Sequence, residues 1–116
     1  MASLEITTVG SGAQRTHLVH TRTVNWVILQ DDHGVTLIDG GYPGHAGAVT
    51  ESLHRIGSAP EEIRAALLTH AHVDHLGGLA VLAREHGFPV FADPLEVAHA
   101  RREYLEQADA KAIVPI

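Results

Sequence analysis

The segment "THAHVDHLGG", residues 69–78, places three histidines and one aspartate within six consecutive positions, 70–75. The apolar run "AALL", residues 65–68, stands before it, and leucines and alanines at helical spacing follow it. This order indicates a buried strand that runs through a short loop into a helix. Such a loop presents its side chains at the carboxyl edge of a sheet, where α/β folds commonly hold ligands. The segment therefore predicts an α/β fold with a site at that edge.

Strand-like patterns recur on both sides of this segment. Short runs rich in β-branched and other apolar residues predict strands at 4–9, 17–21, 25–29, 35–39, 65–68 and 88–92. The turn-forming "QDDHG", residues 30–34, joins the third and fourth of these as a hairpin. The Gly-rich "GSGAQ", residues 10–14, is expected to be a loop between the first two.

Three stretches with apolar residues at helical spacing predict helices. The first ends at Gly57, and the second runs from residue 74 or 75 to 85 and stops at Gly87. The third begins with Asp93 as its N-cap and continues to Leu105. The alternation of strands and helices predicts one domain over residues 1–116, of α/β class, with helices packed on a mixed β-sheet.

Composition narrows the class of protein. The chain has 116 residues, of which 45% are apolar, enough for one sizeable core. Eight basic residues stand against fourteen acidic ones, so we expect no nucleic-acid and no membrane partner. The N-terminus lacks the basic start and the continuous apolar stretch of a signal peptide, which makes the cytoplasm the expected location. Because cysteine is absent, a metal site here must use nitrogen and oxygen donors.

The crowded histidines are a candidate metal site. In an extended loop His70 and His72 point the same way and can bind one ion. Asp74 and His75 turn the corner and can face the same ion or a second one. Imidazole and carboxylate suit zinc best, with iron or manganese as alternatives. Without a bound ion, three imidazoles placed together would repel one another whenever they are protonated, and nothing would offset that cost. We therefore expect one or two bound ions, with Zn²⁺ as the first choice.

The same segment resembles the HxHxDH signature of the metallo-β-lactamase superfamily and matches it at all four ligand-type positions. Upstream, "NWVILQDDHGVTLIDGG", residues 25–41, is similar to that family's strand with an Asn, its hairpin, and its apolar strand ending in Asp-Gly. The resemblance extends roughly over residues 9–91. It implies one half of a four-layer αββα sandwich, the N-terminal α/β half, with the C-terminal half absent.

By this resemblance His70 and His72 hold a first metal, while Asp74 and His75 hold a second. Asp39 would lie beneath the site as an acceptor that orients a ligand, although a role in the turn alone explains it equally well. Each metal then has two ligands from the motif, fewer than the three protein ligands of a usual catalytic zinc.

The family's second half supplies the ligands that this chain lacks: a His for the first metal, an Asp that bridges both, and a His for the second. A longer or split protein, the pairing of two copies, or a substitute histidine would each complete the site. The candidate substitutes are His17, His20 and His45, although each is more simply a surface or turn histidine. The missing half also leaves one sheet face uncovered, so we expect a twofold homodimer or a complementary second half.

The resemblance implies a metal-dependent hydrolase. A bound ion would lower the pKa of water, and the resulting hydroxide would attack an ester, thioester, lactone or amide of a small-molecule substrate. Asp74 would orient the hydroxide or carry its proton. Such an enzyme would be active only once a second half or a second chain completes the site. The other hypothesis is a non-catalytic metal-binding or self-assembling half-domain; nucleic-acid processing ranks last because the chain is acidic.

Overall fold

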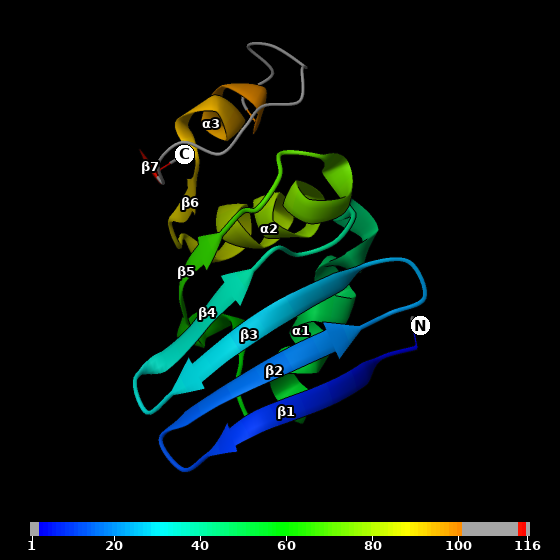
Figure 1. Cartoon of the computed structure of the whole chain (residues 1–116), viewed down its shortest axis with the longest axis vertical. Coiled ribbons are helices and arrows are strands. Elements are labelled where there is room, and N and C mark those ends of the chain that lie inside the picture. The colour runs from blue at the N-terminus through cyan, green and yellow to red at the C-terminus, as the bar shows by residue number, and fades with distance from the viewer. Residues whose placement is uncertain (1–2, 101–113, 116) are drawn as a thin grey trace.

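A single mixed sheet of seven strands forms the framework of residues 3–100 and 114–115, which the computed structural model describes (Figure 1). The strands lie in space in the order of the chain: β1 (Glu5–Ser11), β2 (Gln14–His20), β3 (Asn25–Asp31), β4 (Gly34–Ile38), β5 (Ile63–Leu67), β6 (Val90–Ala92) and β7 (Val114–Pro115). Strands β1 to β4 are antiparallel, β4 to β6 are parallel, and β7 is antiparallel to β6. The predicted α/β class with a mixed sheet is confirmed.

Both N-terminal hairpins turn more tightly than their loop-like sequences suggest. The predicted hairpin of β3 and β4 forms, and within its turn Asp31 Oδ1 accepts the His33 N–H at 2.7 Å. The expected loop at residues 10–14 is shorter than predicted, because Gly10 pairs with Arg15 and Ser11 with Gln14 in the β1–β2 ladder. Cross-strand hydrogen bonds thus extend both strands into a segment whose composition alone is typical of a loop.

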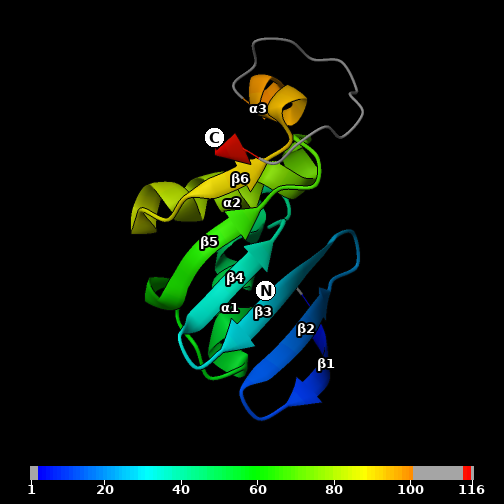
Figure 2. The same ribbon diagram turned by 60° about the vertical axis from the view of Figure 1, so that its left-hand side comes forward.

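Helices α1 (Ala46–Arg55) and α2 (Val73–His86) lie on one side of the sheet, and α3 (Pro94–Ala100) lies beyond the end of β6 (Figure 2). The chain also forms the single turns η1 (Pro43–His45) and η2 (Pro60–Glu62). The predicted stop of α2 is confirmed, since Gly87 adopts φ 75° and its N–H bonds the Ala83 carbonyl. Asp93 caps α3 by accepting the Leu95 N–H at 2.8 Å, while the expected continuation to Leu105 lies outside the described residues. Within the described part, no helix is long and apolar enough to cross a membrane.

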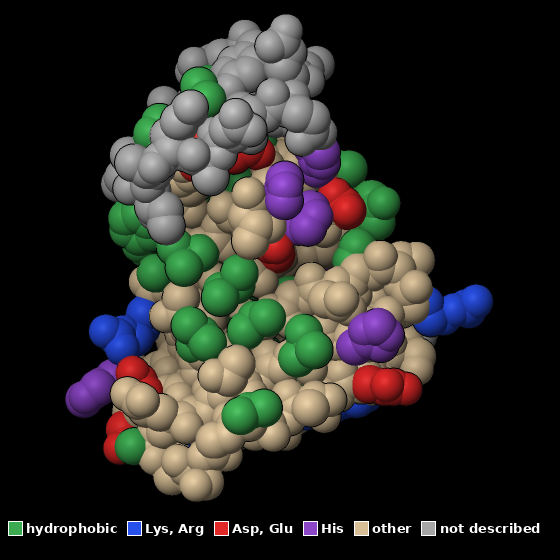
Figure 3. Space-filling model, in the orientation of Figure 1, with side chains coloured by type: hydrophobic (Ala, Val, Ile, Leu, Met, Phe, Trp, Pro, Cys, Tyr) green, Lys and Arg blue, Asp and Glu red, His purple; other side chains and the backbone are tan. Residues whose placement is uncertain are grey.

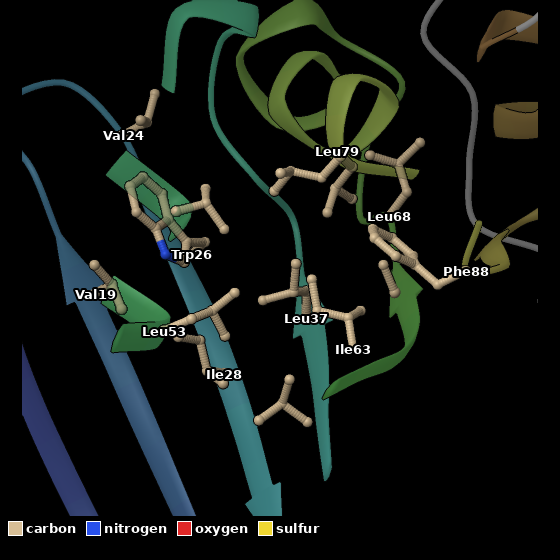
Figure 4. Packing of buried hydrophobic residues seen from close by; sticks show 14 of the residues in the cluster. Val19, Val24, Trp26, Ile28, Leu37, Leu53, Ile63, Leu68, Leu79 and Phe88 are labelled. Carbon is tan, nitrogen blue, oxygen red and sulfur yellow. The ribbon is translucent and has the colours of Figure 1, made fainter. Parts of the chain in front are cut away.

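The core lies between the sheet and the two longer helices (Figure 4). Trp26 and Leu37 from the sheet meet Leu53 of α1 and Leu79 of α2, and each is at most 1% exposed. The one polar atom of the Trp26 side chain is satisfied, because its Nε1–H donates to Ser52 Oγ at 3.1 Å. This packing fixes the helices against the strands and leaves the carboxyl ends of β4 and β5 free to carry a site.

The opposite sheet face carries apolar side chains with no helix over them (Figure 3). The ladder register sets the residues of this face, seven apolar and three Thr, in two rows that cross five strands: Thr7, Leu18, Val27, Ile38 and Leu67, and beside them Val9, Thr16, Leu29, Thr36 and Ala65. Val9 is 68% exposed, Leu18 43% and Leu29 38%. Since soluble proteins seldom leave a large apolar patch in water, the homodimer stays a prediction that this face supports.

The uncovered face gives a first test. Changing Leu18 and Leu29 together to Asp should convert the expected homodimer into a monomer, because a buried charge in the interface lacks a partner. Analytical ultracentrifugation measures the outcome. The control His54→Asp introduces an acid at an exposed position of α1 and should leave the dimer intact. A wild-type protein that sediments as a uniform monomer would contradict the prediction.

Candidate metal centre

The predicted ligands gather in the loop between β5 and α2 and in the first turn of α2. The ring centre of His70 lies 5.9 Å from that of His72 and 5.2 Å from that of His75. Asp74 joins them, since its Oδ2 is 3.6 Å from His75 Nε2. Figure 3 shows a group of histidines above the carboxyl ends of the strands. The fold therefore brings all four side chains of the motif to one corner.

Asp39 lies directly after β4 and is almost buried, with 7% exposure. Its Oδ1 accepts the Thr69 N–H at 2.8 Å, and its Oδ2 accepts the Thr69 hydroxyl at 2.6 Å. Oδ2 also lies 2.9 Å from His75 Nδ1. Because a carboxylate accepts, Nδ1 of His75 carries the proton of this bond, which leaves Nε2 as the ring nitrogen that faces Asp74.

The backbone of Asp39 is in a conformation that residues other than glycine seldom adopt. Its φ is +64°, the one positive φ among the non-glycine residues described. Such a conformation costs roughly 1–3 kcal/mol and persists where the surroundings hold it. Here the Asp39 N–H donates to the Leu67 carbonyl at 2.9 Å, and the three acceptor contacts hold the side chain. Strain at this position places the carboxylate under the histidines.

A close backbone contact fixes the start of α2 against the loop after β4. The Gly40 N–H donates to the His75 carbonyl at 3.0 Å, and the Gly78 N–H donates to the Gly41 carbonyl at 3.0 Å. A Cβ on Gly78 would overlap the Gly40 carbonyl, and one on Gly77 would overlap the ring of Pro43. The two glycines of the motif are therefore needed for close approach and not merely for flexibility at a helix start.

Glu96 is a residue of the corner that the sequence pattern did not reveal. It lies in the first turn of α3, is 4% exposed, and its Oε1 accepts the Ala71 N–H at 2.6 Å. Ala71 stands between His70 and His72. In the sequence, Glu96 looks only like an acidic residue that favours a helix start, and nothing local signals a partner 25 positions away.

The three candidate substitute histidines have partners elsewhere. His17 is buried and bonds Thr8 Oγ1 and Gln30 Oε1 through its two ring nitrogens, each at 2.8 Å. His20 bonds the Asn25 side chain at 2.7 Å. The ring of His45 packs on Trp26 and Tyr42, and its Nδ1 accepts the Tyr42 N–H at 3.1 Å. Both nitrogens of His17 are thus engaged, which removes it as a simple substitute.

The donor set fits a metal in type but not in number. Two imidazoles on one tetrahedral zinc, with bonds of about 2.0–2.1 Å, have ring centres roughly 5 Å apart, close to the spacing from His70 to His75. Within residues 3–100 and 114–115, however, no group of three or more His, Asp or Glu side chains is arranged to hold an ion. The ring spacing and the donor chemistry favour a metal, while the coordination sphere needs further donors. The ligand roles stay a prediction.

Comparison with known proteins identifies the family. The model of the metallo-β-lactamase superfamily matches residues 21–115, so this chain belongs to that superfamily. The Rm3 metallo-β-lactamase has a similar structure, with a TM-score of 0.68 and 32% identity over 72% of this chain and 31% of that one.

Two curated relatives bear different names. The exodeoxyribonuclease WalJ of Streptococcus pneumoniae is 40% identical over 69 residues, which are 60% of this chain and 25% of the relative. A hydroxyacylglutathione hydrolase of Xanthomonas campestris is 42% identical over 57 residues, 49% of this chain and 20% of the relative. The matched part of the chain thus spans no more than a quarter of the length of either relative.

The glycine contact gives a second test. Gly78→Ala should lower the free energy of unfolding by about 1–3 kcal/mol, because the new methyl group forces α2 away from the Gly40 carbonyl. Chemical denaturation measures the change. Gly47→Ala is the matched control: Gly47 lies in α1 with open space around it, so the same substitution should be neutral or stabilise by up to about 1 kcal/mol. Equal effects of the two substitutions would contradict the close-approach argument.

Proposed function

We propose that this chain is the metal-binding half of a hydrolase, with one or two ions held by His70, His72, Asp74 and His75. Zinc is the first choice, with iron or manganese as alternatives. The observation that carries the proposal is the hydrogen bond from His75 Nδ1 to the buried Asp39 carboxylate, 2.9 Å long. A carboxylate behind an imidazole fixes the tautomer and raises its basicity, which is how proteins orient metal-binding histidines.

A pocket beside the histidines supports a small-molecule substrate. Its volume is about 440 Å³, and Asp74 and His75 line it together with apolar side chains that include Val24 and Ile38. An acyl compound could place its apolar part against Val24 and Ile38 and its carbonyl near Asp74. A bound metal would lower the pKa of a water molecule and polarise the carbonyl of an ester, thioester, lactone or amide.

Asp74 is the proposed catalytic residue. Its side chain is 35% exposed and borders the pocket, so it can reach both substrate and water. Its Oδ2 lies 3.6 Å from His75 Nε2, close enough for the two groups to share the corner where a reacting group would bind. A carboxylate at this place can orient a water molecule and accept its proton.

The remaining donors are proposed to come from a second copy of the chain or from a complementary second half. The shortage of donors within the described residues and the uncovered sheet face both support this. A half-domain that binds metal or assembles without catalysis is the alternative. Processing of DNA, suggested by the name of one relative, is disfavoured by the formal charge of −6.

Metal uptake tests the ligand assignment. Replacing both His70 and His72 with Ala should abolish stoichiometric zinc binding, because the motif then retains one imidazole. Elemental analysis of protein dialysed against zinc measures the bound metal. The matched control changes His33 and His54, two exposed histidines remote in sequence from the motif, to Ala and should retain the metal. Equal zinc in both double variants would refute the assignment.

Turnover tests the activity. With added zinc or manganese, the chain should hydrolyse a generic ester, thioester or lactone, and Asp74→Asn should lower the rate by about 10²–10⁴-fold. Asp32→Asn, in the exposed β3–β4 turn, is the control and should leave the rate unchanged. Metal content is measured for each variant, so that loss of metal is separated from loss of catalysis. A zinc-loaded but inert wild-type chain would support the non-catalytic alternative, and cleavage of single-stranded DNA alone would support the nuclease.

A further inference from the structure

The loop that carries the first two histidines leaves the sheet between two carboxylates. Up to Leu68 the backbone of this segment has a strand partner, since the Leu68 N–H donates to the Phe91 carbonyl at 2.9 Å. After Leu68 the segment bends, and side-chain oxygens are the acceptors instead: Asp39 Oδ1 for the Thr69 N–H and Glu96 Oε1 for the Ala71 N–H, at 2.8 and 2.6 Å. The loop is thus held on one side by the residue after β4 and on the other by α3.

The Ala71 amide sets the direction of the flanking side chains. Ala71 is fully buried, whereas His70 is exposed and His72 half-buried. In an extended segment, alternate side chains point to the same side, opposite to the residue between them. Holding Ala71 inward therefore places both imidazoles outward on one side, where their ring centres are 5.9 Å apart and their planes differ by 30°.

Glu96 is poorly explained as a helix cap. The first turn of α3 already has one, since Asp93 Oδ1 accepts the Leu95 N–H and the Asp93 carbonyl accepts the Val97 N–H. An acid that only favours a helix start can stay in water. Glu96 is instead 4% exposed and makes a short hydrogen bond to another segment. Because burial of a carboxylate is costly without hydrogen-bond donors, the bond from the Ala71 N–H helps to stabilise Glu96 in its buried position.

We propose that Glu96 is a positioning residue, which through the Ala71 amide presets the spacing of His70 and His72 and thereby strengthens metal binding. The proposal rests on the proposed function for the metal, but the geometry it describes exists without one. A preset pair of imidazoles needs less ordering when an ion binds, which raises affinity without a new contact to the ion.

Three variants of the full chain test the role in metal binding. Glu96→Ala removes the acceptor, and Glu96→Asp keeps the charge but shortens the side chain by one methylene. Both should weaken zinc binding by about 10–100-fold, the usual effect of losing a group that supports a ligand. Glu96→Gln keeps an acceptor oxygen at the same reach and should restore most of the affinity. Titration calorimetry with zinc alone measures the affinities.

Glu85→Ala is the matched control, because Glu85 is an exposed acid on α2 and its loss changes the net charge equally. It should bind zinc as the wild type does. If the folded Glu96→Ala and Glu96→Asp variants also bind zinc as the wild type does, the proposal is wrong. If Glu96→Ala does not fold, Glu96→Asp and Glu96→Gln decide between the outcomes by the same comparison.

Hydrogen exchange in the metal-free protein separates this proposal from the proposed function. In Glu96→Asp the Ala71 amide should exchange about tenfold faster or more, while the Thr69 amide, held by Asp39, keeps its protection. Equal loss of protection at both amides would mean a general structural role and would overturn the proposal. A wild-type chain that binds no zinc would refute the metal function and with it the effect of Glu96 on affinity, and the Ala71 amide would still decide whether Glu96 positions the loop.

Discussion

The carboxylate of Asp39 joins the three parts of the molecule that meet at the histidine corner. It stands at the end of β4, accepts two hydrogen bonds from Thr69 at the start of the loop, and accepts a third from His75 in the first turn of α2. Its removal would take the acceptor away from the Thr69 N–H, the Thr69 hydroxyl and the His75 ring, and donors left without a partner away from water are costly. Its positive φ shows that the backbone accepts strain to place it there.

The glycines and Glu96 complete this arrangement from two other sides. Gly77 and Gly78 let the backbone of α2 approach the loop after β4 closely. On the side of α3, Glu96 accepts a hydrogen bond from the Ala71 N–H and so fixes the histidine loop. The corner is therefore fixed by backbone contacts and by two buried carboxylates. Rigid support of this kind is what a binding site requires, since small displacements of its donors weaken binding. The same fold leaves its other sheet face apolar and open, and the chain matches the two curated relatives over no more than a quarter of their length.

Local chemistry made much of the fold predictable from the sequence. Gly87 ends α2 in the left-handed conformation, Asp93 caps α3, and the β3–β4 hairpin forms at its Asp-rich turn, each as its residue types suggest. The β1–β2 loop was expected to be longer, because pairing of Gly10 and Ser11 across the ladder depends on the partner strand and not on composition. Among the described residues of the site, the motif residues could be found by spacing. Glu96 could not, because its partner is 25 positions away and its sequence context suggests a helix start.

We propose as the central claim that the imidazoles of His70, His72 and His75 converge on a cation, for which the described residues of this chain supply too few donors. Diffraction from zinc-grown crystals, with anomalous data collected on both sides of the zinc edge, tests it most directly. The account predicts an anomalous peak within bonding distance of these rings, with its remaining ligands contributed by a second chain or a second half. The contradicting result would be rings that point apart into solvent, with no anomalous peak between them in crystals grown with excess zinc.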